Sequence, residues 1–299
     1  MTTSAVRTVG QPSGVRVTGI VPPIPTPFLD GRIDLDSLRR MLDELFDSVD
    51  GVLVGGSTGE AASLTVAERE AAIGTVAAHF GGERSLVVSV ADNSIENSRR
   101  LSEVAGESGA DLLVVSCPTY FPNDQQMLES YFGYISDFAS ADICLYDNPV
   151  ASNTQLSVDQ ILALLAAVPR LTHIKVTDTA LGKVEAISDR ASVTIHAGDD
   201  SVLWHQLRGG AEGTMTAIAM VYPEKTATMW RSFRAGDVDD AYRVYRELSH
   251  FIHCCLSSLD YPAVVKTVFQ RRGILASAEV RTPLRPLSRA RLEEVVAAY

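Results

Sequence analysis

Short apolar runs rich in β-branched residues alternate with longer amphipathic stretches along most of this sequence, and this alternation constrains the fold most strongly. Each run is almost continuously hydrophobic, which is typical of strands buried on both faces of a parallel sheet. We predict eight such strands, beginning near Val15, Gly51, Ser85, Asp111, Asp142, Leu171, Ser192 and Glu212.

The stretches between these runs read as helices with recognisable starts. Thr65 to Glu68 and Ser157 to Gln160 have the capping-box pattern, in which a hydroxyl and an acidic or amide side chain satisfy each other's backbone amides. Asn123 and Asp124 serve similarly before a helix that runs to about Ser140. Eight strands that each precede a helix predict an α/β fold, a (β/α)8 TIM barrel. The alternative, an open doubly wound sheet, lacks a G-x-G-x-x-G after its first strand.

After the eighth strand the sequence stays helical, with predicted helices over Pro223–Arg234, Val238–Leu256, Tyr261–Arg272 and Ser288–Ala298. We therefore predict an N-terminal tail over residues 1–14, a barrel over residues 15–234 and a small C-terminal helical extension over residues 235–299.

The charge balance excludes several classes of partner. The 299 residues include 26 Lys and Arg against 37 Asp and Glu, a formal net charge of −11. Such a surface repels phosphate backbones and anionic lipid headgroups, so we expect neither nucleic acid nor membrane partners. The four cysteines form no CxxC pair and Met1–Gly14 has no apolar h-region, so we expect a cytoplasmic protein with reduced thiols.

In a barrel of this kind the active site lies at the carboxyl ends of the strands, and Lys175 is the unusual residue there. Burying its ammonium group without a partner costs several kcal/mol, and an amine in such a place gives up its proton more readily. A neutral lysine can form a Schiff base with a carbonyl substrate, and Tyr146 on the neighbouring strand could move the protons. The alternative is a structural lysine paired with Asp178 or Asp199.

A glycine-rich turn, Gly56-Ser57-Thr58-Gly59-Glu60, follows the second strand directly. Backbone amides and hydroxyl groups in such a turn can cradle a carboxylate. The alternative is a tight connection whose glycines serve only the backbone conformation.

Taken together, these motifs resemble the dihydrodipicolinate synthase/N-acetylneuraminate lyase superfamily. The resemblance rests on GSTGE after the second strand, Y-x-x-P after the fifth, IK on the sixth, GDD after the seventh and GTMTAIAMVYPE at the eighth. It extends from about Val15 to Arg272.

The resemblance implies a role for individual residues. Lys175 would form the Schiff base with pyruvate or another 2-oxo acid, and Tyr146 would shuttle protons. Ser57, where the family often has threonine, would relay protons, and Thr58 would hold the carboxylate. Tyr120 matches a tyrosine that reaches into the neighbouring subunit's site in the synthase branch. Further substrate contacts are expected from Gly56, Met215, Ser152, Thr177, Gly198 and Asp200.

The same resemblance implies a class I, imine-forming lyase that acts on 2-oxo acids and aldehydes. It also implies a homotetramer built from two dimers and chemistry without a metal or organic cofactor, so that Asp199 and Asp200 would hold no metal ion. The reaction could be aldol cleavage, aldol condensation, or dehydration of a 2-keto-3-deoxy sugar acid. A non-catalytic barrel that binds a 2-oxo acid is the alternative from another class.

Departures from the family pattern bear on the substrate. The lysine-pathway synthases, which make 4-hydroxy-tetrahydrodipicolinate, carry an arginine two residues after the proline of Y-x-x-P, and this chain has Ala151 there. A second carboxylate would lose its bidentate partner, which disfavours that reaction. Ser152 and Thr177 match the sialic acid lyases, but Ser201 stands where those enzymes have an acidic residue.

Overall fold

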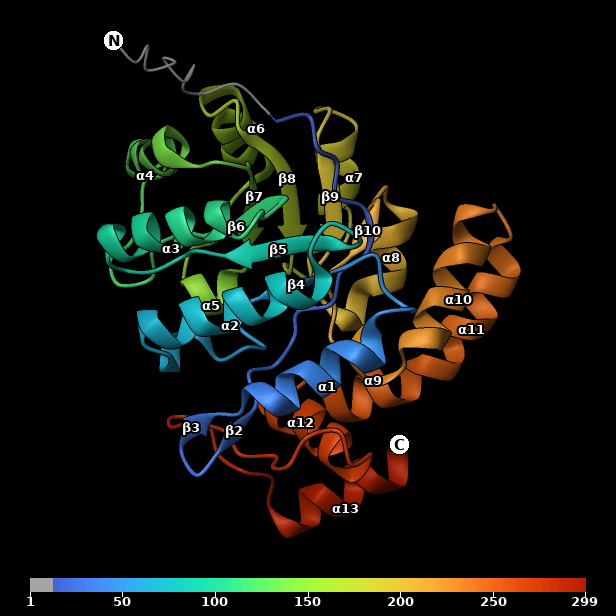
Figure 1. Cartoon of the computed structure of the whole chain (residues 1–299). Coiled ribbons are helices and arrows are strands. Elements are labelled where there is room, and N and C mark those ends of the chain that lie inside the picture. The colour runs from blue at the N-terminus through green and yellow to red at the C-terminus, as the bar shows by residue number, and fades with distance from the viewer. Residues whose placement is uncertain (1–12) are drawn as a thin grey trace.

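A computed structural model describes residues 13–299, and its centre is a sheet of eight parallel strands (Figure 1). The strands follow the order β1-β10-β9-β8-β7-β6-β5-β4 around the sheet. They are β1 (Gly19–Ile20), β4 (Gly51–Val54), β5 (Ser85–Ser89), β6 (Leu112–Ser116), β7 (Asp142–Asp147), β8 (Leu171–Val176), β9 (Thr194–Ala197) and β10 (Gly213–Thr214). All eight predicted strands are confirmed.

The sheet closes into a barrel between the segment that follows β1 and strand β4. Ile24 donates its amide hydrogen to the Leu53 carbonyl at 2.9 Å, and Leu53 donates to Pro22 at 2.9 Å. These bonds join the two ends of the sheet, as closure of a barrel requires. The predicted TIM barrel is therefore confirmed.

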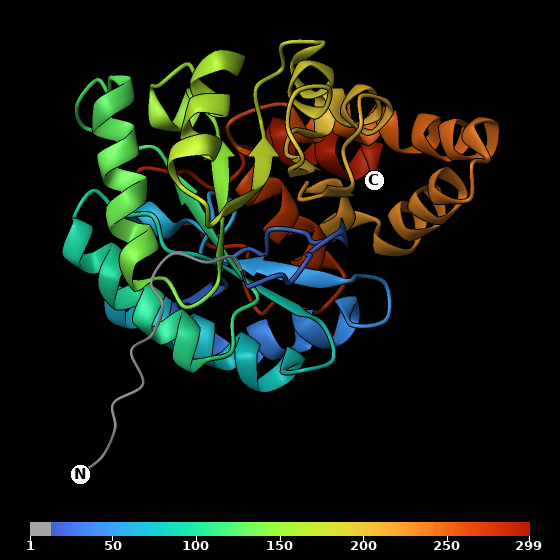
Figure 2. The ribbon, with the colours of Figure 1, turned by 90° about the horizontal axis from the view of Figure 1, so that it is seen from above.

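Helices surround the barrel on all sides (Figure 2). The layer consists of α1 (Leu35–Leu45), α2 (Val66–Phe80), α3 (Ile95–Glu107), α4 (Gln125–Phe138), α6 (Val158–Ala167), α7 (Lys183–Ser188), α8 (Leu203–Arg208) and α10 (Pro223–Arg234). Both predicted capping boxes form, at Thr65 with Glu68 and at Ser157 with Gln160. Asp124 caps α4 through the amide of Met127. Local hydrogen bonding thus fixes where these helices begin.

Some short elements were not predicted. Strands β2 (Phe28–Leu29) and β3 (Arg32–Ile33) form an antiparallel hairpin, and the one-turn helices α5 (Pro149–Ser152) and α9 (Ile218–Val221) follow β7 and β10. The helix predicted over Val238–Leu256 is α11 (Val238–Phe251), which continues as a π-helical turn over Ile252–Leu256. Elements of two to five residues are too short to leave a periodic pattern in the sequence.

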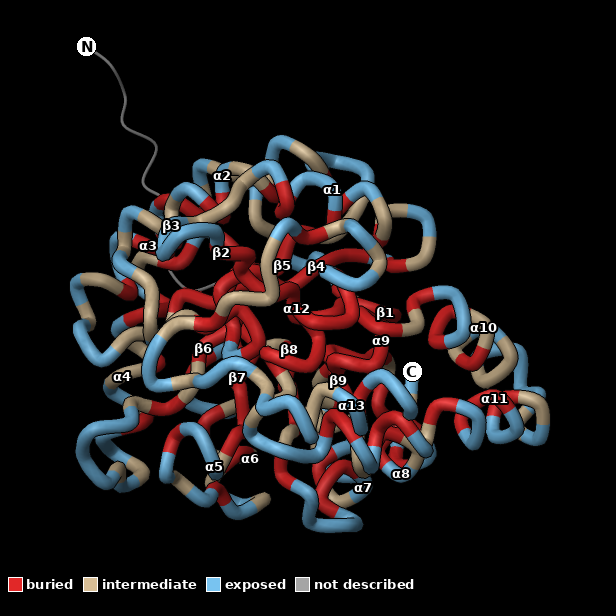
Figure 3. The backbone as a smooth tube through the Cα atoms, turned by 90° about the horizontal axis from the view of Figure 1, so that it is seen from below, coloured by how far each residue is buried: buried red, intermediate tan, exposed pale blue. Residues whose placement is uncertain are grey.

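The C-terminal helices α12 (Tyr261–Arg271) and α13 (Arg289–Ala298) lie at the end of the barrel where the strands finish (Figures 1 and 3). All but one turn of α12 is buried, and its Lys266 side chain forms an ion pair with Glu60 beyond β4. The C-terminal extension therefore covers the end of the barrel at which we expected the active site.

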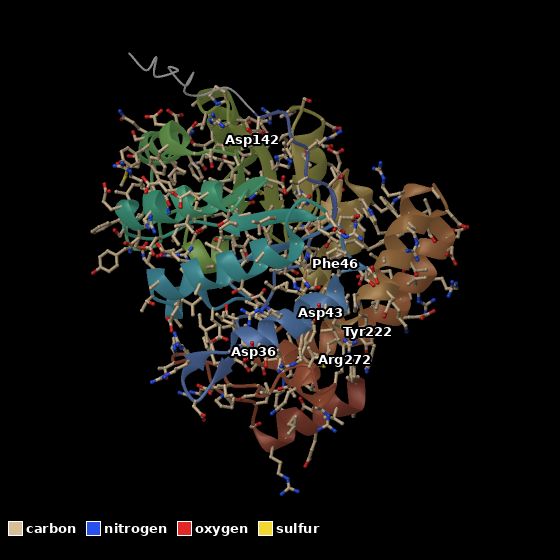
Figure 4. The ribbon with its side chains drawn as sticks, viewed as in Figure 1. Asp36, Asp43, Phe46, Asp142, Tyr222 and Arg272 are labelled. Atoms are coloured by element: carbon tan, nitrogen blue, oxygen red, sulfur yellow. The ribbon has the colours of Figure 1, made fainter. Side chains whose placement is uncertain are left out.

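The opposite end of the barrel is covered by the segment before β1. Ser13 donates its backbone amide hydrogen and its hydroxyl hydrogen to Asp142, at 2.7 Å and 3.0 Å. Asp142 lies at the start of β7 (Figure 4). Most of the predicted tail over residues 1–14 lies outside the described residues.

Apolar side chains pack in two separate layers. Inside the barrel, Val17, Val21, Leu53, Val87, Leu112, Val114, Cys144, Tyr146 and Met215 form one cluster. A larger cluster fills the space between the strands and the helices. Among the described residues, no helix has the length and apolar character needed to cross a membrane.

Candidate active site

Lys175 and Tyr146 are register partners on the adjacent strands β8 and β7. Partners in a parallel ladder present their side chains on the same face, here toward the interior of the barrel. Lys175 is 4% exposed, Tyr146 is 8% exposed, and the lysine Nζ lies 4.3 Å from the centre of the tyrosine ring. The structure thus brings together the two residues on which the predicted chemistry depends.

Neither of the ion pairs considered for Lys175 is formed. Asp178 pairs instead with Lys183 at 2.7 Å, and Asp199 accepts a hydrogen bond from the Ser201 amide at 2.8 Å. Among residues 13–299, no carboxylate lies within ion-pairing distance of Lys175. Lys175 is a buried amine against an aromatic face.

Two histidines occupy the barrel interior on the same side of the sheet. His196 on β9 is the register partner of Lys175, and its ring stacks on that of His173 with 5.9 Å between centres. Burial lowers the pKa of His173 to about 4 and, together with His173 and Lys175, lowers the pKa of His196 to about 3. Both rings are therefore neutral near pH 7, and the lysine has no second cation beside it.

The phenol of Tyr146 has a partner that the sequence analysis missed, Asn148. Asn148 Nδ2 donates to Tyr146 Oη at 2.8 Å. Burial acts to raise the pKa of Tyr146, but the Lys175 ammonium and the polar side chains of Ser57, Thr177 and Asn148 outweigh it, so the pKa is lowered. A phenol that ionises more easily is better suited to accept and return protons.

The glycine-rich turn lies beside this pair. Glu60 donates its amide to the Ser57 carbonyl at 3.0 Å and adopts a left-handed conformation with φ of 57°. Within residues 13–299 the backbone amides of Ser57 and Thr58 have no hydrogen-bond partner. At Gly56 an added Cβ would have ordinary contacts, the nearest at 3.6 Å from Leu53, so close packing does not require glycine there.

Helix α12 contributes a second phenol, Tyr261, which the sequence analysis also missed. Thr58 Oγ1 lies 3.4 Å from Tyr261 Oη, and burial with the nearby Tyr146 raises the pKa of Tyr261. The Lys266–Glu60 ion pair, 206 residues apart in sequence, attaches the same helix to the turn. In the sequence, the local feature that marks Tyr261 is the Tyr-Pro pair at the start of its helix, which does not indicate contact with the site.

At the ends of β9 and β10, backbone packing is tight. A Cβ on Gly198 would lie 2.6 Å from Thr177 Oγ1 and 2.7 Å from the Val176 carbonyl, so glycine is required there. The Asp200 carboxylate accepts hydrogen bonds from the amides of Ala217 and Ile218, at 3.0 and 2.7 Å. Burial raises the pKa of Asp200 to about 6. Met215 is fully buried, with its amide bonded to the Ala197 carbonyl at 2.8 Å.

The remaining predicted residues lie on or near α5 and α4. Ser152 is buried and donates its hydroxyl hydrogen to the Asn148 carbonyl at 2.8 Å, within α5 itself. Tyr120 is 78% exposed and packs edge-on against Phe121. Roles toward a substrate stay predictions for all of the predicted site residues, Ser152 and Tyr120 included.

Lys183, a second buried lysine, is already paired. Its Nζ lies 2.7 Å from both Asp147 and Asp178 and donates to the Leu156 carbonyl at 2.8 Å. For the part of the chain from residue 13 onward, no group of three or more His, Cys, Asp or Glu side chains is placed to hold a metal ion.

Comparison with known proteins gives a consistent result over nearly the whole chain. The profile described as "Dihydrodipicolinate synthetase family" matches residues 16–299. A 4-hydroxy-tetrahydrodipicolinate synthase of Moorella thermoacetica is 32% identical over 278 residues, which cover 91% of this chain and 94% of the relative. The protein of the same name from Methanococcus maripaludis strain C5 is 28% identical over 267 residues, 89% of this chain and 92% of the relative.

Among solved structures, the 4-hydroxy-tetrahydrodipicolinate synthase of Methylacidiphilum fumariolicum SolV superimposes with a TM-score of 0.90 at 24% identity. The match covers 95% of each chain. This similarity concerns the fold.

Proposed function

We propose, from the premise that this chain belongs to the dihydrodipicolinate synthetase family and is an imine-forming lyase, that Lys175 forms the imine with pyruvate or another 2-oxo acid. The observation that carries the assignment is the Lys175–Tyr146 pair. Lys175 is buried, has no carboxylate partner among the described residues and lies against a phenol of lowered pKa, an arrangement suited to attack on a carbonyl carbon.

The carboxylate of the 2-oxo acid would bind at the glycine-rich turn. The backbone amides of Ser57 and Thr58 support this, because among the described residues neither has a partner and each N–H can donate to a carboxylate oxygen. Bound there, the acid would present its 2-oxo carbon to Lys175, and Thr58 would orient it further through its hydroxyl group.

Tyr146 would move the protons. Attack of Nζ on the 2-oxo carbon gives a carbinolamine, and loss of its hydroxyl as water gives the imine; Tyr146 takes the amine proton and returns it to the leaving oxygen. In aldol cleavage the imine nitrogen then accepts the electron pair of the C3–C4 bond, and a base takes the 4-hydroxyl proton. Because the imine itself accepts the electron pair, the proposed chemistry needs no metal ion or organic cofactor.

The acceptor side of the site favours an aldehyde without a second carboxylate. Val150 is 80% exposed and the neighbouring Ala151 is exposed as well, where the synthase branch has its arginine. Lys183 is held by two aspartates and Lys266 by Glu60, so neither offers a free cation. The second candidate, 4-hydroxy-tetrahydrodipicolinate synthase, is favoured by the names of the relatives.

A substrate panel separates the two. Aspartate semialdehyde with pyruvate is compared with neutral polyhydroxylated and apolar aldehydes, and the matching 4-hydroxy-2-oxo acids are run in reverse with coupled pyruvate detection. We expect turnover of a neutral partner, slow turnover of aspartate semialdehyde, and a gain of about tenfold or more with that substrate in Ala151→Arg, because a bidentate cation is restored. Turnover of aspartate semialdehyde by the natural protein at about 1–10³ s⁻¹ would establish the synthase reaction instead.

We infer a homotetramer of paired dimers from family resemblance, with Tyr120 at the tighter interface. The 78% exposure of Tyr120, next to the exposed Phe121, supports a partner surface at this position. Sedimentation analysis of the natural protein and of Tyr120→Ala tests it, and a natural protein that sediments as a monomer would overturn it.

A further inference from the structure

Asn148 connects the first turn of α5 to the phenol of Tyr146. The side chain is 7% exposed and lies at the N-cap of α5, directly before Pro149. Its Oδ1 accepts the amide hydrogen of Ala151 at 3.1 Å, and its Nδ2 donates to Tyr146 Oη at 2.8 Å.

The helix start fixes which way the amide faces. The backbone N–H of Ala151 can only donate, so the atom that faces it must be the carbonyl oxygen of Asn148. The amino group is then directed at Tyr146 and has no freedom to flip without losing the cap. The phenol oxygen is an acceptor on this side, and its own hydrogen must point elsewhere.

We propose that Asn148 is a positioning residue for Tyr146: its amino group holds the phenol oxygen so that the phenol delivers its proton away from α5, toward Lys175 and the bound 2-oxo acid. This inference rests on the proposed function and assigns how the proton carrier is oriented. Other groups also face the phenol: the Lys175 ammonium over its ring, Tyr261 from α12, and the hydroxyls of Ser57 and Thr177. Asn148 is the one whose direction is set by a helix cap.

The same contact stabilises the ionised phenol, because a donor bonds more strongly to a charged oxygen than to a neutral one. Asn148 is among the groups that lower the pKa of Tyr146. A residue that only capped α5 would have no such effect on proton transfer, and this difference can be measured.

The test is exchange of the pyruvate methyl hydrogens in D₂O, followed by NMR between pH 6 and 10, because exchange requires the imine and its enamine but no acceptor substrate. In Asn148→Asp the carboxylate still accepts from Ala151, so α5 keeps its cap, but the donor to Tyr146 is lost. We expect about tenfold slower exchange at pH 7.5. In the plot of exchange rate against pH, the part that rises as the Tyr146 phenol ionises should move to higher pH by about one unit. Asn148→Ser, which also caps a helix but lacks the amino group, serves if the aspartate variant does not fold.

The matched control is Pro149→Ala, which loosens α5 without removing the amino group. Its pH profile should keep the position of the natural protein. An unshifted pH profile and an unchanged exchange rate in both Asn148 variants would overturn the inference. An equal shift in Pro149→Ala would also overturn it, because the shift would then come from loosening of α5 and not from loss of the amino group. Borohydride trapping with pyruvate separates failure of this inference from failure of the proposed function. Label on Lys175 together with unshifted pH profiles in the Asn148 variants would overturn only this inference. Absence of label on Lys175 would overturn the proposed function and this inference with it.

Discussion

At the scale of single residues, the site depends on how a lysine and a tyrosine meet inside the barrel. Lys175 and Tyr146 are register partners, so their side chains share a face, and the amine lies 4.3 Å from the ring centre. The period of two along each strand made this meeting predictable once the two strands were taken as neighbours. Asn148 was not predictable in the same way, because its contact with Tyr146 depends on how α5 turns back after the strand.

Replacing Tyr146 with phenylalanine keeps the ring and removes the hydroxyl group that we propose as the proton carrier. We expect turnover to fall by about 10²-fold or more, with a much smaller loss of pyruvate binding, because proton transfer and binding depend on different groups. Steady-state kinetics and calorimetric binding of pyruvate measure the two effects, with the surface variant Tyr134→Phe as the control. Equal losses in turnover and binding would mean that Tyr146 only positions its neighbours.

At the scale of elements, sequence patterns located the strands and most helix starts but not the contact of α12 with the site. Capping pairs such as Thr65 with Glu68 lie three residues apart, so a local pattern reveals them. The Lys266–Glu60 ion pair joins residues 206 apart, and Tyr261 approaches Thr58 because α12 packs over the barrel end. Contacts of this kind follow from the tertiary fold, which no short window of sequence contains.

The Lys266–Glu60 pair should be needed for stability. Both side chains are fully buried, and Lys266→Met would leave the Glu60 carboxylate in the interior without its cation. We expect a loss of about 3–5 kcal/mol in the free energy of unfolding, measured in urea. The double variant Lys266→Met/Glu60→Gln should recover part of it.

The exposed pair of Lys225 with Glu247 provides the comparison. Its two side chains are 50% and 44% exposed, so Lys225→Met should change the free energy of unfolding by less than about 1 kcal/mol. Equal effects of Lys225→Met and Lys266→Met would contradict the structural role given to the buried pair.

At the scale of the whole molecule, the two interior histidines link folding to pH. The folded protein lowers the pKa of His173 to about 4 and of His196 to about 3, from 6.5, mainly because burial disfavours the charged ring. A lowered pKa means that the unfolded chain binds these protons first, so their contribution to stability is complete above pH 6.5. It is lost as the pH falls toward 4 and 3, by roughly 1.4 kcal/mol per pH unit for each ring.

Asp200 acts in the opposite direction, because its pKa is raised to about 6 and the folded state binds its proton first. A comparison of variants separates the contribution of His196 to this pH dependence from that of Asp200. We expect the free energy of unfolding in urea to change less steeply with pH between 4.5 and 6 in His196→Leu than in the natural protein. The difference in slope should correspond to the uptake of about one proton on unfolding. The matched control is the same substitution at an exposed ring, His205→Leu. An unchanged slope in His196→Leu would show that this ring is protonated in the folded state.

The barrel as a whole was predictable because each strand and helix has a local sequence pattern. The identity of the substrate is not predictable in this way, because the acceptor side is defined by exposed residues such as Val150 and Ala151. What every candidate reaction shares is the imine on Lys175. Incubation of the protein with pyruvate and borohydride, followed by peptide mapping by mass spectrometry, tests that imine directly. We predict one reduced pyruvyl adduct, on the peptide that contains Lys175, and its absence from Lys175→Ala. An adduct on Lys183 or Lys266, or an adduct that persists in Lys175→Ala, would contradict the account.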